Sequence, residues 1–388
     1  MKLLIVNNEF PPTGGGAGRT TYYLARELVK LGHEVSILTS TSPELLDLPS
    51  LQGVKVHRVF SWRKSVQEAG KRGILMFLLL GSLRFISLLL TNRYDLVYYF
   101  SSIPAGLLSI FAPRHPSVMG LRGLDVPGRD QDSFRTIHKL LKPINLRTWR
   151  WANLVIASSA NLAESARRYA PDLPITVMYN GVDTDLFYPA PTSSAHKPFR
   201  VISVSRLIKL KGFQYLIEAM SSFQPEECQL TLIGTGSYEA ELRALTQQLG
   251  VEDRVTFAGY QSHAVLPEMM HQADVFVLPS YGDSYASAFL EAMACGLPVV
   301  GADVGGAREL IRSGENGLLV PPHDVDAITD AIRALMRDEQ LRLRLRETAL
   351  QEIRDEHSWE AYGRKNAEMF AGVLGKSATS RRMRVTQA

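Results

Sequence analysis

Residues 279–296 read PSYGDSYASAFLEAMACG, and the apolar run 275–278 precedes them. The apolar run predicts a buried strand, and the second half of the stretch predicts a helix that ends at Gly296 as a C-cap. A strand, a turn of small residues and a helix bring free backbone N–H groups and the positive end of a helix to the rim of a sheet. The stretch therefore predicts a site for a phosphate group.

Two carboxylates accompany this turn. Asp283 lies in the loop before the predicted helix, and Glu291 lies about a turn and a half inside it. We interpret the stretch as a cradle for a nucleotide-sugar, in which the helix N-terminus holds the diphosphate. In this interpretation Asp283 faces hydroxyls of the sugar, and Glu291 accepts hydrogen bonds from the ribose diol.

Seven residues separate Asp283 from Glu291, and the second acid stands within the run LEAMACGLPVV of residues 290–300. This pattern resembles the paired-acid motif of family 4 glycosyltransferases, which are retaining enzymes of the GT-B fold with two facing Rossmann-like domains. The family usually has Glu at the first position, so Asp283 is shorter by one methylene. The resemblance implies that Asp283 is catalytic and that the donor is bound by Asp283, Tyr285, Ala286, Ser287 and Glu291.

Composition limits the class of protein. The 388 residues suffice for two domains, and shares of 45% apolar and 21% charged residues are typical of a soluble globular protein. A net charge of +4 favours small anionic ligands or a lipid surface over nucleic acid. Cys228 and Cys295 lie in apolar runs, so we expect no disulfide and a reducing cytoplasm. Residues 1–7 form too short an apolar run for a signal peptide.

Short apolar runs alternate with helical patterns through both halves of the chain, which predicts an α/β architecture with mostly parallel, doubly wound sheets. The polar connector 189–198 separates the halves. We predict a Rossmann-like acceptor-binding domain over residues 1–188 and a Rossmann-like nucleotide-sugar-binding domain over 189–357, with an interdomain cleft for ligands. By resemblance, a last helix at about 358–374 packs back on the first domain. Residues 375–388 are predicted to be a disordered basic tail.

A glycine run, residues 14–16, follows the first predicted strand. Backbone without side chains can approach a phosphate or a sugar closely, although such a turn is also common without any ligand. A P-loop is excluded, because Thr13 replaces the required first glycine and Arg19 stands in place of the lysine. The segment resembles the first loop of family 4 glycosyltransferases, which implies that Gly15 and Gly16 contact the donor.

Two cations, Arg206 and Lys211, stand just past a predicted strand and before a helix. A departing nucleoside diphosphate develops negative charge, which two cations and a helix N-terminus stabilise without a metal. A solvated basic turn is the plainer interpretation. The segment 204–212 resembles the family's Gly-Arg-Leu…Lys-Gly motif, which implies that both cations bind the donor and take part in catalysis.

Residues 120–127 read GLRGLDVP and follow another predicted strand. Many relatives have His-Gly-x-Asp here, with the His touching the donor sugar. In this chain Arg122, Gly123 and Asp125 become the candidates for acceptor or sugar contact. Either the sugar contact is kept in another form, or Arg122 meets an anionic sugar or an acceptor phosphate.

The backbone around Gly259 and Tyr260 resembles a family loop that frames the nucleotide base, with a plain strand-end turn as the alternative. Asp183 and Asp185 form an Asp-x-Asp pair that suggests a metal site, but their run resembles the family's Asn-Gly-Val-Asp turn. The histidines show no ligand spacing, and two cysteines cannot build a zinc site. We expect no metal and no cofactor, the nucleotide-diphosphate sugar being a co-substrate.

Residues 74–90 are strongly apolar, but Arg84 interrupts them, so the unbroken part is about half of a ~20-residue membrane span. One interpretation is a helix packed on the sheet. The other, given Lys64, Lys71 and Arg72 nearby, is a face that docks on anionic lipid.

These residues and the resemblance predict a retaining, metal-independent glycosyltransferase that transfers a sugar from a nucleotide-diphosphate sugar to an acceptor hydroxyl, in bacterial polysaccharide or glycolipid biosynthesis. Its partners are the donor and a glycan or lipid-linked acceptor, not nucleic acid, and its place is the cytoplasm, peripherally on the inner face of an anionic membrane. Two alternatives stay open. The chain could be an inactive nucleotide-sugar-binding partner subunit, which Asp283 and Arg122 permit, or a sugar-nucleotide epimerase on the same fold.

Overall fold

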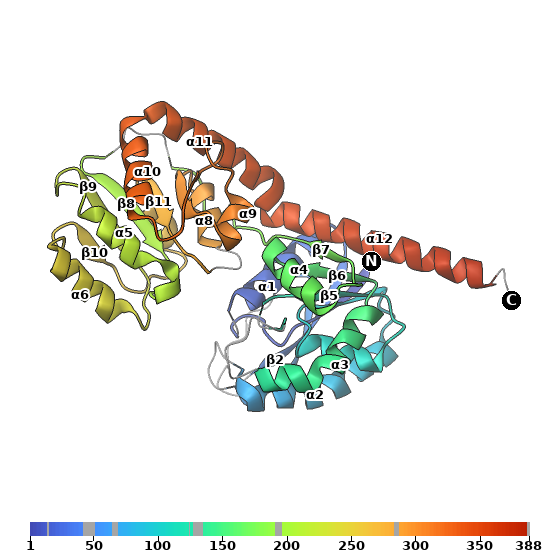
Figure 1. The fold of residues 1–388 in the computed structure, drawn as a ribbon. Coiled ribbons are helices and arrows are strands. Elements are labelled where there is room, and N and C mark those ends of the chain that lie inside the picture. Colours follow the sequence, from blue (N-terminus) through green and yellow to red (C-terminus); the bar gives the residue numbers. More distant parts are fainter. Residues whose placement is uncertain are drawn as a thin grey trace. The chain divides into compact units, whose positions relative to one another are not determined.

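The computed structural model describes the chain except residues 14, 42–50, 64–68, 124, 127–134, 191–195, 283–286 and 386–388, and it does not describe the side chains of 135–140 and 377–385. The chain forms two compact units, one of Met1–Asn180 with Trp359–Ala388 and the other of Gly181–Ser358 (Figure 1). The chain therefore passes between the units twice. The domain boundary that we predicted between residues 188 and 189 lies a few residues after Asn180, where the chain first passes to the second unit.

The first unit is built on a seven-stranded sheet in which every strand pair is parallel, in the order β3-β2-β1-β4-β5-β6-β7. Its strands are β1 (Lys2–Val6), β2 (Glu34–Thr41), β3 (Val54–Phe60), β4 (Leu96–Tyr99), β5 (Ser117–Leu121), β6 (Leu154–Ala157) and β7 (Ile175–Val177). Its helices are α1 (Gly16–Lys30), α2 (Gly70–Thr91), the 3-10 helix η1 (Ala105–Phe111), α3 (Arg135–Trp151), α4 (Ala160–Tyr169) and α12 (Trp359–Val385).

Both faces of this sheet are covered by helices. Leu4 and Val6 of β1 pack with α2, η1, α3 and α4 in one core, whereas Leu3 and Ile5 pack with α1 and α12 in another. Successive side chains of a strand point to opposite faces, so a strand covered on both faces must be apolar throughout. This is why the strands read as nearly unbroken apolar runs.

Helix α12 belongs to the first unit, although the chain enters it from the second. Trp359 stacks on Tyr23 of α1 with ring centroids 4.8 Å apart, and Phe370 meets Tyr98 of β4 at 5.4 Å. The helix continues to Val385, whereas we expected a disordered tail from residue 375. Residues 376–385 contain neither proline nor glycine, the two residues that oppose a helix most.

The second unit has a six-stranded, fully parallel sheet in the order β10-β9-β8-β11-β12-β13. Its strands are β8 (Phe199–Val204), β9 (Cys228–Ile233), β10 (Val255–Phe257), β11 (Val275–Leu278), β12 (Val299–Ala302) and β13 (Leu318–Val320). Its helices are η2 (Lys209–Lys211), α5 (Phe213–Met220), α6 (Glu239–Leu249), α7 (Leu266–His271), α8 (Ser287–Ala294), α9 (Gly305–Leu310), α10 (Val325–Arg337), α11 (Glu339–Glu352) and the π-helix η3 (Ile353–His357).

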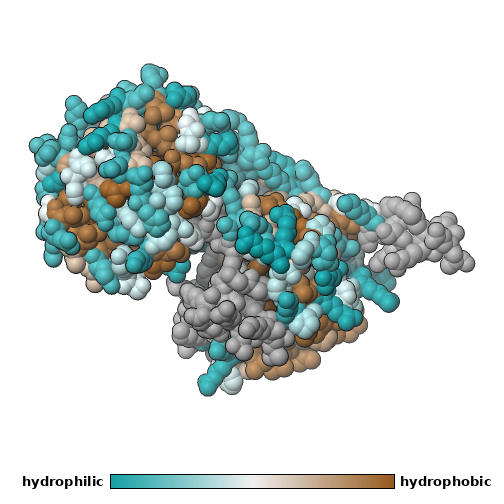
Figure 2. Space-filling view, viewed as in Figure 1, coloured by the Kyte–Doolittle hydropathy of each residue, from teal (hydrophilic) through white to brown (hydrophobic). Residues whose placement is uncertain are grey.

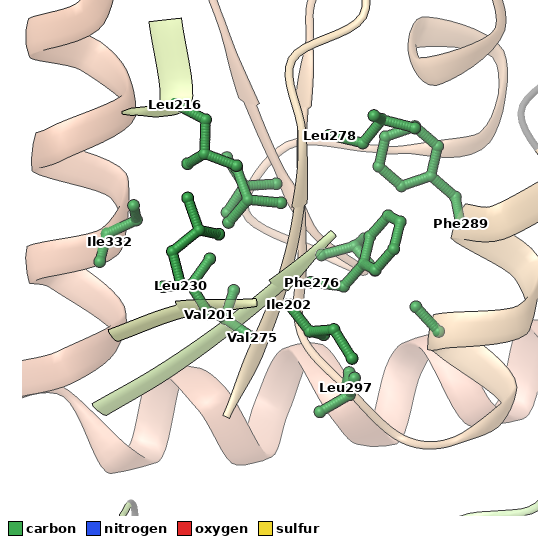
Figure 3. Close-up of a cluster of buried hydrophobic side chains, with 14 of the residues drawn as sticks. Val201, Ile202, Leu216, Leu230, Val275, Phe276, Leu278, Phe289, Leu297 and Ile332 are labelled. Carbon is green, nitrogen blue, oxygen red and sulfur yellow. The ribbon is translucent and has the colours of Figure 1, made fainter. Parts of the chain in front are cut away.

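Helices sandwich this second sheet as well. Figure 3 shows Leu216 of α5 and Ile332 of α10 on one side of the strands and Phe289 of α8 on the other. Phe289 meets Phe276 of β11 edge to face with ring centroids 5.4 Å apart. This contact holds α8 against β11.

Strand order reverses once in each sheet, between β1 and β4 in the first and between β8 and β11 in the second. Open α/β sheets bind ligands at the carboxyl ends of their strands, where such a reversal splits the loops apart. The loops that begin at residues 7, 100, 205 and 279 start at these two points. The prediction of two doubly wound α/β units is thus confirmed.

Candidate active site

The two motif segments of the second unit lie against each other at the strand reversal. The backbone N–H of Tyr281 and the hydroxyl of Ser280 both donate to the carbonyl oxygen of Leu210, each at 3.2 Å. Gly212 has a left-handed backbone (φ 73°), and a Cβ there would lie 2.1 Å from the carbonyl oxygen of Pro279. The loop with the two cations is therefore seated directly on the turn that precedes α8.

The two predicted cations differ in exposure. Arg206 is exposed just past β8, whereas Lys211 is buried with 8% of its surface exposed. Lys211 ends η2 and is followed by Gly212, the N-cap of α5. A buried ammonium acts in a lower effective dielectric than an exposed one, so its interaction with an anion is stronger.

Two further loops adjoin the Arg206 loop. The N–H of Leu207 donates to Thr235 (3.0 Å), and the N–H of Gly234 donates to Gly259 (2.8 Å). A Cβ at Gly234 would lie 1.9 Å from the carbonyl oxygen of Ser205, so only glycine allows this approach. The loops after β8, β9 and β10 therefore form one layer at the carboxyl edge of the sheet.

Tyr260 extends from this layer. It follows Gly259, whose backbone is left-handed (φ 67°), and 75% of its surface is exposed. An exposed aromatic ring beside strand-end backbone can stack on a nucleotide base. The contact of Gly259 and Tyr260 with the base stays a prediction.

Glu291 has a partner that the sequence did not reveal. His263 Nε2 lies 2.9 Å from Glu291 Oε1, and the His263 ring packs edge-on against Phe187 at 4.8 Å. Glu291 lies in α8 with 15% of its side chain exposed. His263 thereby orients the Glu291 carboxylate, whose contact with the ribose stays a prediction.

The remaining predicted donor residues of the second unit lie at or beyond the end of the described turn. Ser287 is the first residue of α8 and is exposed. Asp283, Tyr285 and Ala286 lie outside the described residues.

In the first unit, Gly15 and Gly16 open α1, directly after the β1 loop. The N–H of Gly15 donates to Glu9 Oε2 at 3.2 Å. A Cβ added at either glycine would meet no atom within 4 Å in the described part of the chain. Packing of the described residues does not require glycine here, which leaves room for a ligand beside the backbone.

Arg122 is anchored inside the first unit. Its guanidinium donates to the Phe100 carbonyl (3.1 Å), Asn180 Oδ1 (3.3 Å), Tyr98 OH (2.6 Å) and Tyr362 OH (3.4 Å), and it lies 3.7 Å from the centre of the Phe100 ring. Burial raises the pKa of Tyr98, which keeps this phenol neutral. Arg122 therefore links two segments of the first unit. One ends at Asn180, where the chain leaves for the second unit, and the other is helix α12, which begins after the chain returns.

Asp125 shapes the loop that carries Arg122. Its Oδ1 accepts from the N–H groups of Arg122 and Gly123 at 2.8 Å each, and its Oδ2 accepts from the N–H of Ser102 at 2.9 Å. Asp125 is 6% exposed. A buried carboxylate that accepts three backbone hydrogen bonds is satisfied within the protein, so Asp125 acts as a support of the loop.

The Asp183–Asp185 pair forms a local turn, in which Asp183 Oδ1 accepts from the N–H of Asp185 at 3.1 Å. In the part of the chain that the structure describes, no group of three or more His, Cys, Asp or Glu residues is placed to hold a metal ion. Cys228 and Cys295 are both buried and free.

Two parallel α/β sheets, each with loops gathered at its strand reversal, define a two-domain nucleotide-binding protein of the Rossmann-like class. Comparison with solved structures gives the fold. The chain matches sucrose-phosphate synthase from Thermosynechococcus elongatus with TM-score 0.78 and 22% identity, covering 97% of this chain and 100% of that one. It matches HepE of Anabaena in complex with UDP with TM-score 0.76 and 23% identity, covering 96% and 100%. The fold is therefore GT-B.

Sequence models match both halves of the chain, "Glycosyltransferase Family 4" over residues 14–186 and "Glycosyl transferases group 1" over 187–352. A glycosyltransferase of Methanocaldococcus jannaschii is 27% identical over 95% of this chain and 98% of its own length. A GDP-mannose-dependent phosphatidylinositol monomannoside mannosyltransferase of Mycolicibacterium smegmatis is 26% identical over 95% and 98%. The chain belongs to the family 4 glycosyltransferases and uses a nucleotide-diphosphate sugar as donor.

Proposed function

We propose that this chain is a retaining, metal-independent glycosyltransferase that transfers a hexosyl group to the hydroxyl of a glycan or a lipid-linked acceptor. The second unit binds the donor, and the first unit binds the acceptor. Arg206, Lys211 and Asp283 carry the catalysis. The observation that supports this most is the seating of the Arg206–Gly212 loop on the turn before α8.

Charge development on the leaving group governs the proposed chemistry. As the glycosidic bond to the donor breaks, the diphosphate gains negative charge. The ammonium of Lys211, the guanidinium of Arg206 and the N-terminal amides of α8 stabilise this charge. One preorganised donor of this kind typically lowers the barrier by roughly 2.7–4 kcal/mol. Metal independence is proposed because these groups supply the positive charge that Mg²⁺ supplies in other transferases.

Two side chains of the second unit hold the nucleoside, one on α8 and one after β10. Glu291, oriented by His263 at 2.9 Å, accepts hydrogen bonds from the ribose diol. Tyr260, with its exposed ring, stacks on the base, and the backbone of Gly259 lies beside it. Gly15 and Gly16 of the first unit are further donor contacts, because backbone without a Cβ at the start of α1 allows close approach.

The acceptor class is inferred from relatives. The Mycolicibacterium smegmatis relative is named for a phosphatidylinositol mannoside, which is a lipid-anchored glycan. We therefore place this enzyme in polysaccharide or glycolipid biosynthesis, working in the cytoplasm and peripherally on the membrane.

The experiment that tests this function is a thermal-shift screen followed by product analysis. A native-state ligand raises the melting temperature by mass action, so one of UDP, GDP and ADP and its sugar conjugate should stabilise the protein in the presence of EDTA. The stabilising donor is then incubated with lipid and glycan acceptors, and the anomeric configuration of the product is read by NMR. An α-linked product from an α-linked donor supports retention. An inverted product, or transfer that EDTA abolishes, contradicts the proposal.

A further inference from the structure

Helix α2 has two apolar sides, of which one packs in the core and the other is exposed among the residues that the structure describes. Phe77, Phe85 and Leu88 are buried in the core of the first unit, together with side chains of β2 and β4. The helix is long and apolar enough to cross a membrane by length and composition, yet only 28% of its most apolar window is buried. Its other side must therefore contact something else, because water is a poor solvent for so large an apolar surface.

The unused side is a row of leucines. Leu75, Leu79, Leu83 and Leu90 are 59%, 59%, 67% and 82% exposed. Their spacing of four, four and seven residues puts them on one face of the helix. Figure 2 shows hydrophobic residues along the lower edge of the first unit, where Figure 1 draws α2. We call this row of four leucines the leucine face.

Neighbouring elements extend the leucine face. Helix η1 packs beside α2 and exposes Ile110 (44%) and Phe111 (48%), and α3 packs beside η1 and exposes Ile144 (45%). Trp62, 61% exposed, lies at the first turn of α2, since a Cβ at Gly73 would lie 2.8 Å from the Trp62 carbonyl oxygen. Tryptophan at the edge of an apolar surface is typical of the membrane–water interface.

The helices that carry this surface have charges of one sign. The sequences of α2, η1 and α3 contain no Asp or Glu. The exposed basic residues on or beside these helices, among the described side chains, are Lys71, Arg72, Arg84, Arg93, Arg114, Lys142 and Arg147, with Arg150 paired to Asp172. Arg72 precedes Leu75 by three residues and so stands at the end of the leucine face. An excess of basic side chains beside an apolar face complements an anionic surface.

We propose that the leucine face docks this enzyme on an anionic phospholipid bilayer, with α2 lying in the plane of the interface. The leucines enter the boundary of the acyl chains, and Lys71, Arg72 and their neighbours meet lipid phosphates. A spanning α2 would withdraw Phe77 and Phe85, both fully buried, from the core. A second copy seated on this face would bring two sets of these basic side chains together. Docking on the bilayer does not depend on the proposed function. Only the presence of a lipid-linked acceptor in that bilayer rests on it.

The test is sedimentation of the full-length protein with vesicles, without donor or acceptor. Wild-type protein should bind vesicles of equal parts phosphatidylcholine and phosphatidylglycerol, and bind at least about tenfold less to pure phosphatidylcholine. Leu79→Gln with Leu83→Gln should lower the partition coefficient by about tenfold or more. The matched control is Leu31→Gln, a 44% exposed leucine at the end of α1 on the opposite face of the sheet, which should bind as wild type.

A second pair of substitutions, Lys71→Gln with Arg72→Gln, tests the contribution of the basic residues. It should lower binding to the anionic vesicles by about tenfold and reduce the salt dependence of binding. Its control is Arg364→Gln with Lys365→Gln, an adjacent basic pair on α12. Stabilisation by the nucleotide found in the donor screen must persist in every variant, which separates a failure of docking from a failure of the donor site.

Three outcomes overturn the proposal. The first is equal binding of the Leu79/Leu83 variant and the wild type. The second is a wild-type dimer in light scattering that the Leu79/Leu83 variant converts to a monomer, with no vesicle binding. The third is resistance of the bound protein to alkaline carbonate extraction, since a peripheral protein is released and a spanning helix is not.

Discussion

His263 Nε2 lies 2.9 Å from Oε1 of Glu291, 28 residues further along the chain. The two residues come from different elements, since His263 precedes α7 and Glu291 lies within α8. The edge-on contact with Phe187 fixes the imidazole ring, so the carboxylate is held in one orientation before any ligand arrives. Such preorganisation lowers the cost of ordering side chains on binding.

His263→Ala should therefore raise the KM for the donor by about tenfold at most, which is the scale of one hydrogen bond, with kcat changed much less. His263→Gln, which keeps an N–H donor, should recover part of the loss. Steady-state kinetics checks both. His271→Ala on α7, where His271 contacts the Tyr188 carbonyl at 2.7 Å, is the control and should leave KM unchanged. Equal KM values for His263→Ala and wild type would show that Glu291 needs no such support.

Gly212→Ala tests whether the seating of the cation loop depends on glycine. The new Cβ would lie 2.1 Å from the Pro279 carbonyl oxygen, and the backbone there is left-handed. We expect the free energy of unfolding of the second unit to fall by more than about 2 kcal/mol, together with a loss of donor binding. Urea unfolding and the nucleotide-dependent thermal shift measure these effects.

Gly250→Ala is the matched control for that substitution. Gly250 is also left-handed (φ 62°), but a Cβ there meets no atom within 4 Å in the described part of the chain. It should cost only roughly 1–2 kcal/mol for the backbone conformation and leave nucleotide binding intact. Equal effects of the two substitutions would mean that the contact with Pro279 is unimportant.

Arg122→Lys tests whether this guanidinium supports the first unit or contacts substrate. Four hydrogen bonds run from the Arg122 guanidinium to protein groups. Lysine cannot reproduce this forked geometry. We expect the free energy of unfolding to fall by about 2–3 kcal/mol, the scale for a lost hydrogen bond to a charged group. Arg364→Lys, at an exposed pair with Glu360, should change it by less than about 0.5 kcal/mol. Full stability of Arg122→Lys with lost transfer would instead favour contact with the sugar or the acceptor.

Gly16→Ala tests the space beside the start of α1. No described atom lies within 4 Å of a Cβ there, so folding should be unaffected within about 0.5 kcal/mol. If the donor occupies that space, the KM for the donor rises at least about tenfold. Gly18→Ala, whose Cβ would lie 3.0 Å from the Thr13 carbonyl oxygen, should instead lower stability. An unchanged KM for Gly16→Ala would remove this glycine from the donor site.

Most of the fold could be predicted from the sequence, because buried parallel strands leave apolar runs such as Leu3–Val6 and Val275–Leu278 that local pattern reading detects. The motif around Arg206 and Lys211 could also be found, since strand, turn and helix stand together in the chain. Composition could not set the end of α12, because a basic helix end has the composition of a disordered tail.

Contacts between distant segments could not be predicted. Nothing in the spacing of His263 and Glu291 indicates that they meet, since they belong to different elements of the second unit. The same holds for Arg122, whose partners Phe100, Asn180 and Tyr362 come from three parts of the chain. The sequence marked Arg122 as unusual, but only the topology shows which groups it holds.

The role of Lys211 in stabilising the departing diphosphate is tested most directly by comparing two variants, Lys211→Ala and Lys209→Ala. Both lysines belong to η2, but Lys211 is buried and Lys209 is exposed. The readout is the release of nucleoside diphosphate at saturating donor. We predict that Lys211→Ala lowers kcat by about 100-fold or more, on the scale of one lost preorganised charge, while Lys209→Ala stays within about twofold of wild type. A loss below about tenfold for Lys211→Ala, or equal losses for both variants, would contradict the proposed site.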